Sequence, residues 1–173
     1  MNTNNSSNIS IEIADIAAMG TDCVVNAANE GLRMGSGVCG AIFDAAGPAK
    51  LAEACRKLHG CPTGSAVVTP GFDLKARYII HAVGPVWSGT EADKALLSSC
   101  YKTSLDLARE QGCHSIAFPL ISAGVFGCPV DKAWEQAIKT CTAWLQADPD
   151  YGMNIIFAVR KQSVKEAGEK LLR

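Results

Sequence analysis

Apolar residues along the chain follow two alternating patterns, one typical of β-strands and one typical of amphipathic helices. Short β-branched runs are separated by longer segments in which apolar residues recur every three or four positions. The segments expected to form strands are Ile9–Ala14, Cys23–Ala27, Ala66–Thr69, Tyr78–Val83, Ser115–Pro119 and Asn154–Val159. The segments expected to form helices are Gly37–Ala46, Ala49–His59, Ala92–Gln111, Val130–Ala147 and Ser163–Leu172. Strands that alternate with helices predict an α/β fold with a largely parallel sheet.

The clearest helical pattern lies over Ala92–Gln111, where apolar residues form one stripe and Gly112 follows as a stop signal. A second apolar stripe lies over Val130–Ala147. The two shorter helices before them are separated at Gly47-Pro48, because proline ends one helix and fits the first turn of the next. The residues expected to face inward from the two long helices are Leu97, Tyr101, Leu105, Ala108, Trp134, Ala137, Ile138, Cys141 and Leu145.

The length and charge of the chain indicate one domain without a polyanionic partner. A chain of 173 residues buries roughly 70% of its unfolded surface in a single domain. Sixteen Lys and Arg against seventeen Asp and Glu give a formal charge of −1, and the basic residues are scattered. Binding to a nucleic-acid backbone requires a concentrated basic surface, so nucleic acid is not an expected partner. We expect residues 1–8 to form a disordered tail and residues 9–173 a single domain.

The eight cysteines are expected to be reduced thiols rather than metal ligands or disulfides. They include no C-x-x-C pair, and most lie within apolar segments, where free cysteine behaves as a small buried hydrophobe. The nearest zinc candidate, His59-x-Cys61, lacks a second pair of ligands. Met1–Ser10 has no apolar core typical of a signal peptide, and no apolar run reaches membrane-spanning length. We therefore expect a cytoplasmic protein without a metal, a cofactor or a membrane partner.

The stretch Val24–Phe43 carries the strongest chemical signal. A β-branched strand ends near Asn26, a glycine-rich loop follows, and the chain then enters a helix. Such a junction places unpaired backbone N–H groups and the positive end of a helix dipole where an anion can bind. The neutral amides of Asn26 and Asn29 suit sugar hydroxyls. The stretch therefore predicts a site for a phosphorylated sugar.

Part of this loop, Gly35–Gly40, also satisfies the G-x-G-x-x-G pattern of dinucleotide-binding folds. That pattern needs its first glycine at the end of a strand and an acid about 20 residues further on, at the end of the next strand. Here eight residues separate Asn26 from Gly35, and the nearest acid at the required distance, Glu53, lies in a predicted helix. A nicotinamide-dependent oxidoreductase is therefore the least favoured alternative. No Lys-Ser/Thr pair follows the glycines, so a P-loop is excluded.

A second glycine-containing loop, Ile121–Pro129, repeats this arrangement between a predicted strand and a predicted helix. Two such loops at the carboxyl ends of strands can hold a pyrophosphate from both sides through backbone amides. Arg33 is the only basic residue in either glycine-rich loop, so backbone N–H groups and helix dipoles would bind the negative charge. Either loop alone is also compatible with an ordinary tight connection. Together with the asparagines, they favour a ligand site.

The motifs in this order resemble those of the macro domain family, whose members bind ADP-ribose. The residues that carry the resemblance are Val25–Asn29, Ala45–Gly47, Thr63-Gly64, Ile80–Pro85 and Phe118–Gly127. They span most of the chain. The resemblance implies a three-layer α/β/α fold with a mixed, mostly parallel central sheet, and ADP-ribose bound across the ends of its strands.

The resemblance also implies a role for individual residues. Asp15 would accept a hydrogen bond from the adenine amino group, although a cap or surface acid is the plainer alternative. Arg160 would cover the adenine face by its flat guanidinium, with a solvated surface arginine as the alternative. Asn29 would contact the distal ribose, whereas Asn26 would hold its loop in shape. The implied ligand-binding residues are Asp15, Ile16, Asn29, Gly35, Ser36, Gly37, Val38, Ser122, Ala123, Gly124, Val125, Phe126, Val159 and Arg160.

For catalysis the resemblance implies Asn29, Gly37 and Phe126, with Phe126 lying against the distal ribose unless it only packs in the core. The branch of the family that hydrolyses ADP-ribose from proteins commonly has an aspartate and, four residues later, a histidine at the start of this helix. This chain has Cys39 and Phe43 there, and we do not expect Cys39 to act as a base or nucleophile. The loop also resembles viral macro domains, which implies catalysis by a water that the ligand phosphate and backbone groups position.

The sequence therefore predicts an ADP-ribose-binding protein that hydrolyses mono-ADP-ribose from acidic protein side chains, with O-acetyl-ADP-ribose as a possible small substrate. Without general-base help, which contributes about 10²–10⁴-fold, the enzyme is expected to be slow. The alternative is a module that binds ADP-ribose without turnover. Mono-ADP-ribosylated proteins are the expected partners, and the protein is expected to be a monomer. His81, in an apolar strand, is expected to be a hydrogen-bonded core histidine rather than a catalyst.

Overall fold

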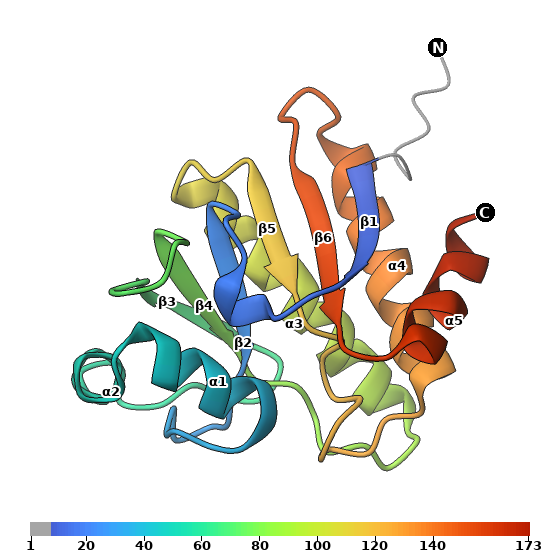
Figure 1. Ribbon diagram of the computed structural model, residues 1–173. Coiled ribbons are helices and arrows are strands. Elements are labelled where there is room, and N and C mark those ends of the chain that lie inside the picture. Colours follow the sequence, from blue (N-terminus) through green and yellow to red (C-terminus); the bar gives the residue numbers. More distant parts are fainter. Residues whose placement is uncertain (1–7) are drawn as a thin grey trace.

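The computed structural model describes residues 8–173, and its centre is a six-stranded mixed sheet (Figure 1). The strand order is β1-β6-β5-β2-β4-β3, and all neighbouring pairs are parallel except β3 with β4. The strands are β1 (Ile9–Ile13), β2 (Cys23–Ala27), β3 (Ala66–Pro70), β4 (Tyr78–Ala82), β5 (Ser115–Phe118) and β6 (Asn154–Val159). Five of the six strands therefore end at the same edge of the sheet.

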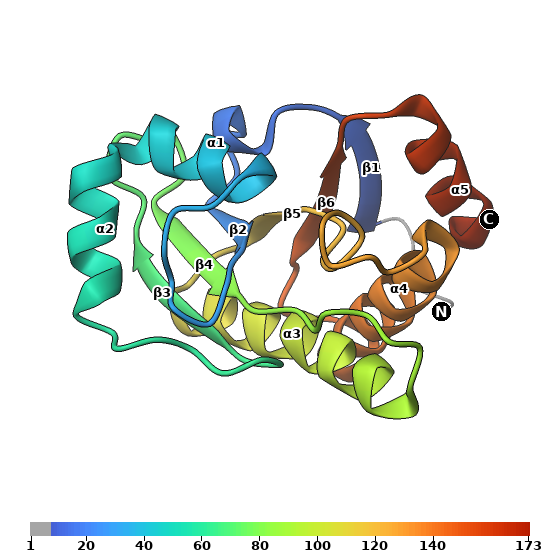
Figure 2. The ribbon, with the colours of Figure 1, turned by 90° about the horizontal axis from the view of Figure 1, so that it is seen from below.

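Helices cover both faces of the sheet (Figures 1 and 2). The α-helices are α1 (Gly37–Ala46), α2 (Pro48–Arg56), α3 (Glu91–Glu110), α4 (Val130–Ala147) and α5 (Gln162–Leu172), and a 3₁₀ helix, η2, spans Ile16–Ala18. Helices α1 and α2 lie on one face, whereas α3 and α4 lie on the other and α5 packs beside α4 and β1. The arrangement is the predicted three-layer α/β/α fold.

Each strand contributes alternate side chains to two separate cores, because successive side chains point to opposite faces of a sheet. On β2, Val24 faces α1 and α2, whereas Val25 faces α3 and α4. Ile79 and Ile80 on β4 alternate in the same way. All four side chains are fully buried. Because both faces are covered, the strands are nearly continuous apolar runs, as expected for a largely parallel sheet.

Aromatic side chains fill the core under α3 and α4. The ring of Tyr101 packs edge-on against Phe118, with 5.0 Å between the ring centroids, and Trp134 packs against Phe157 at 5.1 Å. The Tyr101 hydroxyl accepts a hydrogen bond from the backbone N–H of Ile121 at 3.0 Å. The core therefore holds the start of the loop that follows β5.

Most predicted elements are confirmed to within one to three residues, and the differences have local causes. Helix α2 ends at Arg56 rather than His59, because His59 and Gly60 adopt left-handed conformations with φ of 58° and 89°. The 3₁₀ helix Ile16–Ala18 was not predicted. Ile138, expected to face inward, is only partly buried. Of the predicted tail 1–8, residues 1–7 lie outside the described residues, and the side chain of Asn8 donates to the carbonyl of Met153.

The cysteines of the described region do not cross-link the fold. All eight cysteines are buried free thiols, and none forms a disulfide. Within residues 8–173, none of the helices combines the length and apolar character that crossing a membrane requires. Over the same residues, no three His, Cys, Asp or Glu side chains gather in a way that could hold a metal ion.

His81 is a hydrogen-bonded core residue, as predicted. It is fully buried on β4, where one ring nitrogen, Nδ1, lies 3.1 Å from Nδ2 of Asn26 and the other, Nε2, lies 3.0 Å from Oγ1 of Thr69. Burial lowers the pKa of His81 to about 4, so the ring is neutral at pH 7. Its two nitrogens therefore link three neighbouring strands without introducing a charge.

We predict that this histidine makes the protein less stable in mild acid. The pKa of His81 is about 4 in the folded state and about 6.5 in the unfolded chain, so the unfolded chain binds more protons between these values. Stability should therefore fall as the pH drops through this window, by about 2 to 3 kcal/mol between about pH 7.5 and about pH 4.5. Urea unfolding of the protein and of His81→Gln at the two pH values measures this contribution. A loss in the variant as large as that in the parent protein would show that His81 is not responsible.

Candidate functional site

The carboxyl ends of the parallel strands bring two loops to one edge of the sheet (Figure 2). The first loop, residues 28–36, joins β2 to α1, and the second loop, residues 119–129, joins β5 to α4. Because β2 and β5 are paired parallel neighbours, both loops leave from the same edge. The segment 83–90, which follows β4, leaves from the same edge beside them.

Asn29 is bound to its own loop through both ends of its carboxamide. Its Nδ2 donates to the carbonyl of Arg33 at 2.8 Å, and its Oδ1 accepts from the N–H of Arg33 at 3.0 Å. One amide proton and one lone pair remain available, because a carboxamide offers two of each. The side chain is half-buried, so Asn29 is held in place and still has hydrogen-bonding capacity for a ligand.

The start of α1 presents unpaired backbone donors. Gly35, Ser36 and Gly37 are exposed, and the side chain of Ser36, at the N-cap, makes no capping hydrogen bond. Among the residues that the structure describes, no hydrogen bond engages the backbone N–H groups of residues 35–38. Gly37 has a φ of 57°, which explains why glycine stands there. These donors lie at the positive end of the helix dipole, an arrangement that suits an anion.

The second loop also has unpaired backbone donors. Gly124 and Val125 are exposed, and within residues 8–173 no hydrogen bond engages the N–H groups of residues 124–126. No residue of this loop is charged, and the first loop carries only Glu30 and Arg33. An anion between the loops would therefore be held by backbone dipoles, as the sequence predicts.

Ser122 holds the second loop in shape. Its φ is 68°, its side chain is buried, and its Oγ donates to the carbonyl of Pro85 at 2.8 Å. A side chain at Gly84 would clash with Ser122 and Ile121, so only glycine permits this close approach. The half-buried Phe126 accepts a hydrogen bond through its carbonyl from the N–H of Trp87 at 2.8 Å. The segment after β4 therefore supports the loop, a role that the sequence did not predict.

The residues predicted for the adenine end lie together at the ends of β1 and β6. Asp15 accepts a hydrogen bond from the N–H of Ala17 at 3.0 Å, so it caps η2. Its Oδ1 also lies 4.0 Å from the guanidinium of Arg160. Ile16 and Val159 are buried beneath this pair, whereas Asp15 and Arg160 are exposed. Their contact with an adenine remains a prediction.

Cys39 and Phe43 are buried on the inner side of α1. The Phe43 ring is part of the core between α1 and the sheet. The Cys39 thiol lies 3.5 Å from the carbonyl of Arg33 and 3.7 Å from Nδ2 of Asn26. The start of α1 therefore contains no carboxylate–imidazole pair, and His81 is neutral and fully engaged elsewhere.

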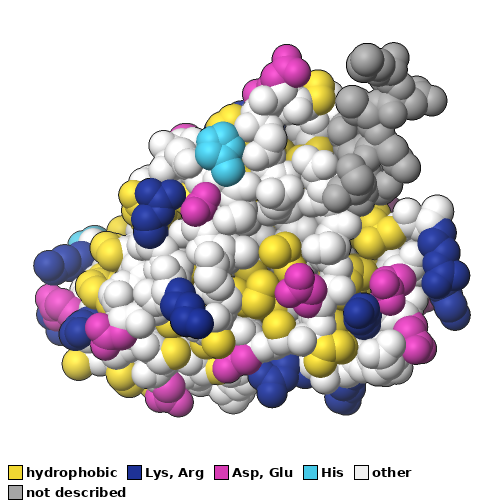
Figure 3. All heavy atoms as spheres, turned by 45° about the horizontal axis from the view of Figure 1, so that its top comes forward, with side chains coloured by type: hydrophobic (Ala, Val, Ile, Leu, Met, Phe, Trp, Pro, Cys, Tyr) yellow, Lys and Arg dark blue, Asp and Glu magenta, His cyan; other side chains and the backbone are white. Residues whose placement is uncertain are grey.

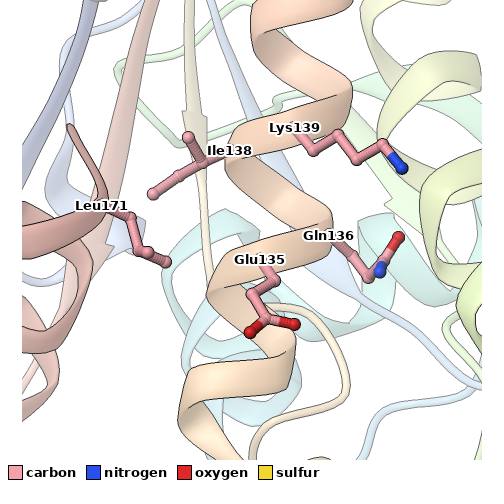
Figure 4. Close-up of a pocket in the computed structure, with 5 residues that line it drawn as sticks. All are labelled: Glu135, Gln136, Ile138, Lys139 and Leu171. Carbon is pink, nitrogen blue, oxygen red and sulfur yellow. The ribbon is translucent and has the colours of Figure 1, made fainter.

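Two hollows on the surface of the described residues are lined by neither residues 35–38 nor residues 124–126. One, of about 410 Å³, lies on the outer side of α4 and α5, and its side chains point in different directions (Figure 4). The other, of about 650 Å³, lies between α2 and the outer side of the first loop. Charged side chains of both signs are interspersed on the face shown in Figure 3. The unpaired N–H groups of residues 35–38 and 124–126 mark the candidate site.

Comparison with known proteins gives the same family from sequence and from structure. The model of the macro domain family matches residues 25–137. A macro domain-containing protein of Ralstonia nicotianae is 56% identical over 128 residues, which are 73% of this chain and 74% of that protein. Human ADP-ribose glycohydrolase MACROD2 is 45% identical over 153 residues, which are 87% of this chain and 36% of that protein.

Two solved structures show how closely the fold agrees. The Oceanobacillus iheyensis macrodomain, solved with ADP, superposes with a TM-score of 0.88 at 37% identity and covers 94% of this chain and 88% of its own. The Trypanosoma brucei macrodomain, solved in complex with ADP-ribose, superposes with a TM-score of 0.89 at 34% identity and covers 96% of this chain and 69% of its own. The chain therefore belongs to the macro domain family.

Proposed function

We propose that the protein binds ADP-ribose at the shared edge of β1, β6, β5 and β2 and hydrolyses mono-ADP-ribose from acidic side chains of proteins. The observation that carries the proposal is the set of unpaired backbone donors at residues 35–38 and 124–126. They lie in loops that leave neighbouring parallel strands, with Asn29 in the first of them. Such donors suit a pyrophosphate, and the carboxamide suits the hydroxyls of a ribose.

In the proposed binding mode, ADP-ribose lies along the sheet edge formed by the ends of β1, β6, β5 and β2. Asp15, Ile16, Val159 and Arg160 would hold the adenine end, and the two loops would hold the pyrophosphate and the distal ribose. The related structures solved with ADP and with ADP-ribose support this ligand class. Asp15 retains Oδ2 for the adenine amino group, because only its Oδ1 is engaged by Ala17 and Arg160.

The proposed reaction uses no charged side chain of this protein. Asn29 and Gly37 orient the distal ribose, Phe126 lies against it, and the ligand phosphate and backbone groups position a water at the anomeric carbon. The water attacks that carbon, the bond between the carbon and the ester oxygen of the modified side chain breaks, and the carboxylate leaves. The attacking water loses one proton to solvent. Proximity and stabilisation of the developing charge then supply the catalysis. The name of the human relative, an ADP-ribose glycohydrolase, supports the reaction class, and O-acetyl-ADP-ribose is a second candidate substrate.

The alternative, a module that binds ADP-ribose without turnover, is favoured by one observation. Cys39 and Phe43 are buried where a base and its partner would stand, so general-base help of about 10²–10⁴-fold is missing. A time course with a protein mono-ADP-ribosylated on glutamate separates the two functions. We expect release of ADP-ribose that is proportional to enzyme concentration. Tight ADP-ribose binding without any release at high enzyme concentration would establish the binding module instead.

We predict that Asn29→Ala lowers kcat strongly, by about 100-fold, because the distal ribose loses its orienting group and the loop loses its cap. Asn154→Ala, which changes an exposed asparagine at the start of β6, is the matched control and should leave kcat unchanged. Single-turnover kinetics on the modified protein measure both. Wild-type kcat in Asn29→Ala would remove Asn29 from the mechanism.

We predict that Asp15→Asn weakens ADP-ribose binding about tenfold and leaves kcat unchanged, because the adenine is remote from the bond that breaks. Asparagine keeps an oxygen for the N–H of Ala17 but lacks the carboxylate charge. Calorimetric titration with ADP-ribose, and with inosine diphosphate ribose as a ligand without the amino group, measures the effect. Equal affinity of both ligands for the unmodified protein would show that the adenine amino group is not recognised by Asp15.

A further inference from the structure

Three polar side chains lie side by side in the core that faces α1 and α2. Thr69, His81 and Asn26 belong to the adjacent strands β3, β4 and β2, and all three are buried. Asn26 is the direct cross-strand partner of His81. A buried polar group costs stability unless it is hydrogen-bonded, so the bonds that these residues make are informative.

The hydrogen bonds among these three side chains run in one direction, from Asn26 through His81 to Thr69. The Thr69 hydroxyl donates to the carbonyl of Pro70 at 3.1 Å, so its oxygen accepts from Nε2–H of His81. Nδ1 of the neutral ring is then an acceptor, and Nδ2 of Asn26 donates to it at 3.1 Å. Thr69 and His81 therefore fix the orientation of the Asn26 carboxamide. The buried Oδ1 of Asn26 has no partner among the described residues, so the carboxamide is held through its nitrogen alone.

The same nitrogen connects the core to the first loop. Nδ2 of Asn26 lies 3.7 Å from Sγ of Cys39, and the Cys39 thiol donates to the carbonyl of Arg33 at 3.5 Å. That carbonyl is also the acceptor for Nδ2 of Asn29, at 2.8 Å. A continuous series of hydrogen bonds therefore runs from the middle of the sheet to the side chain of Asn29.

We infer that Asn26 and Cys39 are positioning residues that fix the Arg33 carbonyl and, through it, the carboxamide of Asn29. The inference rests on the proposed function only in taking Asn29 as the residue that meets the distal ribose. Cys39 then has a role that needs no thiolate, because its S–H acts as a donor from a buried position at the start of α1. Asn26 is buried between the sheet and α1, and its hydrogen bond to Cys39 helps to hold the exposed first loop against the strands.

Three variants test each connection in turn. Cys39→Ala removes the thiol donor, Cys39→Ser replaces it with a hydroxyl, and Asn26→Asp keeps the shape of the side chain but removes both amide protons. Cys141→Ala is the matched control, because it truncates a fully buried cysteine on α4 in the other core. Circular dichroism and thermal unfolding establish that each variant is folded. Should Asn26→Asp not fold, the comparison of Cys39→Ala with Cys39→Ser still decides the role of Cys39.

The expected result is a loss in kcat with little change in affinity for free ADP-ribose. Misplacing a catalytic group lowers kcat by about 10- to 100-fold, and we expect Cys39→Ala and Asn26→Asp to fall in this range. Cys39→Ser should retain more activity than Cys39→Ala, and Cys141→Ala should match the parent protein. A merely structural role would lower thermal stability without this division between kcat and affinity and without rescue by serine.

A second readout does not depend on turnover. The Asn29 carboxamide protons should exchange with solvent faster, by NMR, in Cys39→Ala and Asn26→Asp than in the parent protein or in Cys141→Ala. If the parent protein binds ADP-ribose but releases none from modified protein, the hydrolase proposal fails and this measurement alone decides the positioning proposal. Unchanged exchange at Asn29 in Cys39→Ala and Asn26→Asp would overturn it, as would equal kcat values for Cys39→Ala and Cys39→Ser.

Discussion

The parallel pairing of β2 with β4 on one side and with β5 on the other is the constraint on which the site depends. Parallel strands end at the same edge, so both loops and the segment 83–90 must leave the sheet side by side. Each loop then enters a helix whose first N–H groups have no partner within the helix. The register matters as much as the direction, because shifting β2 by one residue would turn Asn26 away from His81 and Cys39. A sheet that serves mainly to bury apolar side chains thus also places the polar groups of the site.

The fold could be predicted from the sequence wherever the burial of one or both faces of a strand or helix makes apolar residues recur at a regular spacing. Strands β2 and β6 and helices α1 and α4 have the predicted bounds, since apolar runs, Gly47 and Pro129 mark their ends locally. The premature end of α2 could not be predicted. There the carbonyl of Glu30 accepts from the N–H of Cys61, so a loop distant in sequence determines the conformation at Gly60. The 3₁₀ helix Ile16–Ala18 has two backbone hydrogen bonds, and its one side-chain signal is the carboxylate of Asp15, which accepts from the N–H of Ala17. That signal is too small to separate the helix from an ordinary turn.

The candidate site likewise has a part that could be predicted from the sequence and a part that could not. Glycines and asparagines could be identified from the sequence because the chemistry of an anion site restricts residue type. The groups that support them are mostly backbone carbonyls, such as those of Arg33 and Pro85. Every residue has a backbone carbonyl, so the amino-acid sequence does not indicate which of them act as acceptors. Asn26 could be recognised as unusual, since it is a polar residue within an apolar strand. Its partners on β3, β4 and α1 follow only from the strand order.

Asn26, Asn29 and His81 have one property in common, which is that their side chains are uncharged at pH 7. A carboxylate at the position of Cys39 would stand near a bound pyrophosphate, and like charges repel, so the acid would oppose binding while offering a base. The thiol removes that repulsion and keeps a donor for the carbonyl of Arg33. His81 contributes two hydrogen bonds without a charge because burial keeps it neutral at pH 7. The candidate site is therefore built from dipoles that would favour a bound dianion, and the proposed catalysis would depend on how accurately Asn29 and a water are placed rather than on a strong base. Accuracy of this kind requires a rigid support, and the buried series from Thr69 to Cys39 provides a direct connection between Asn29 and the sheet.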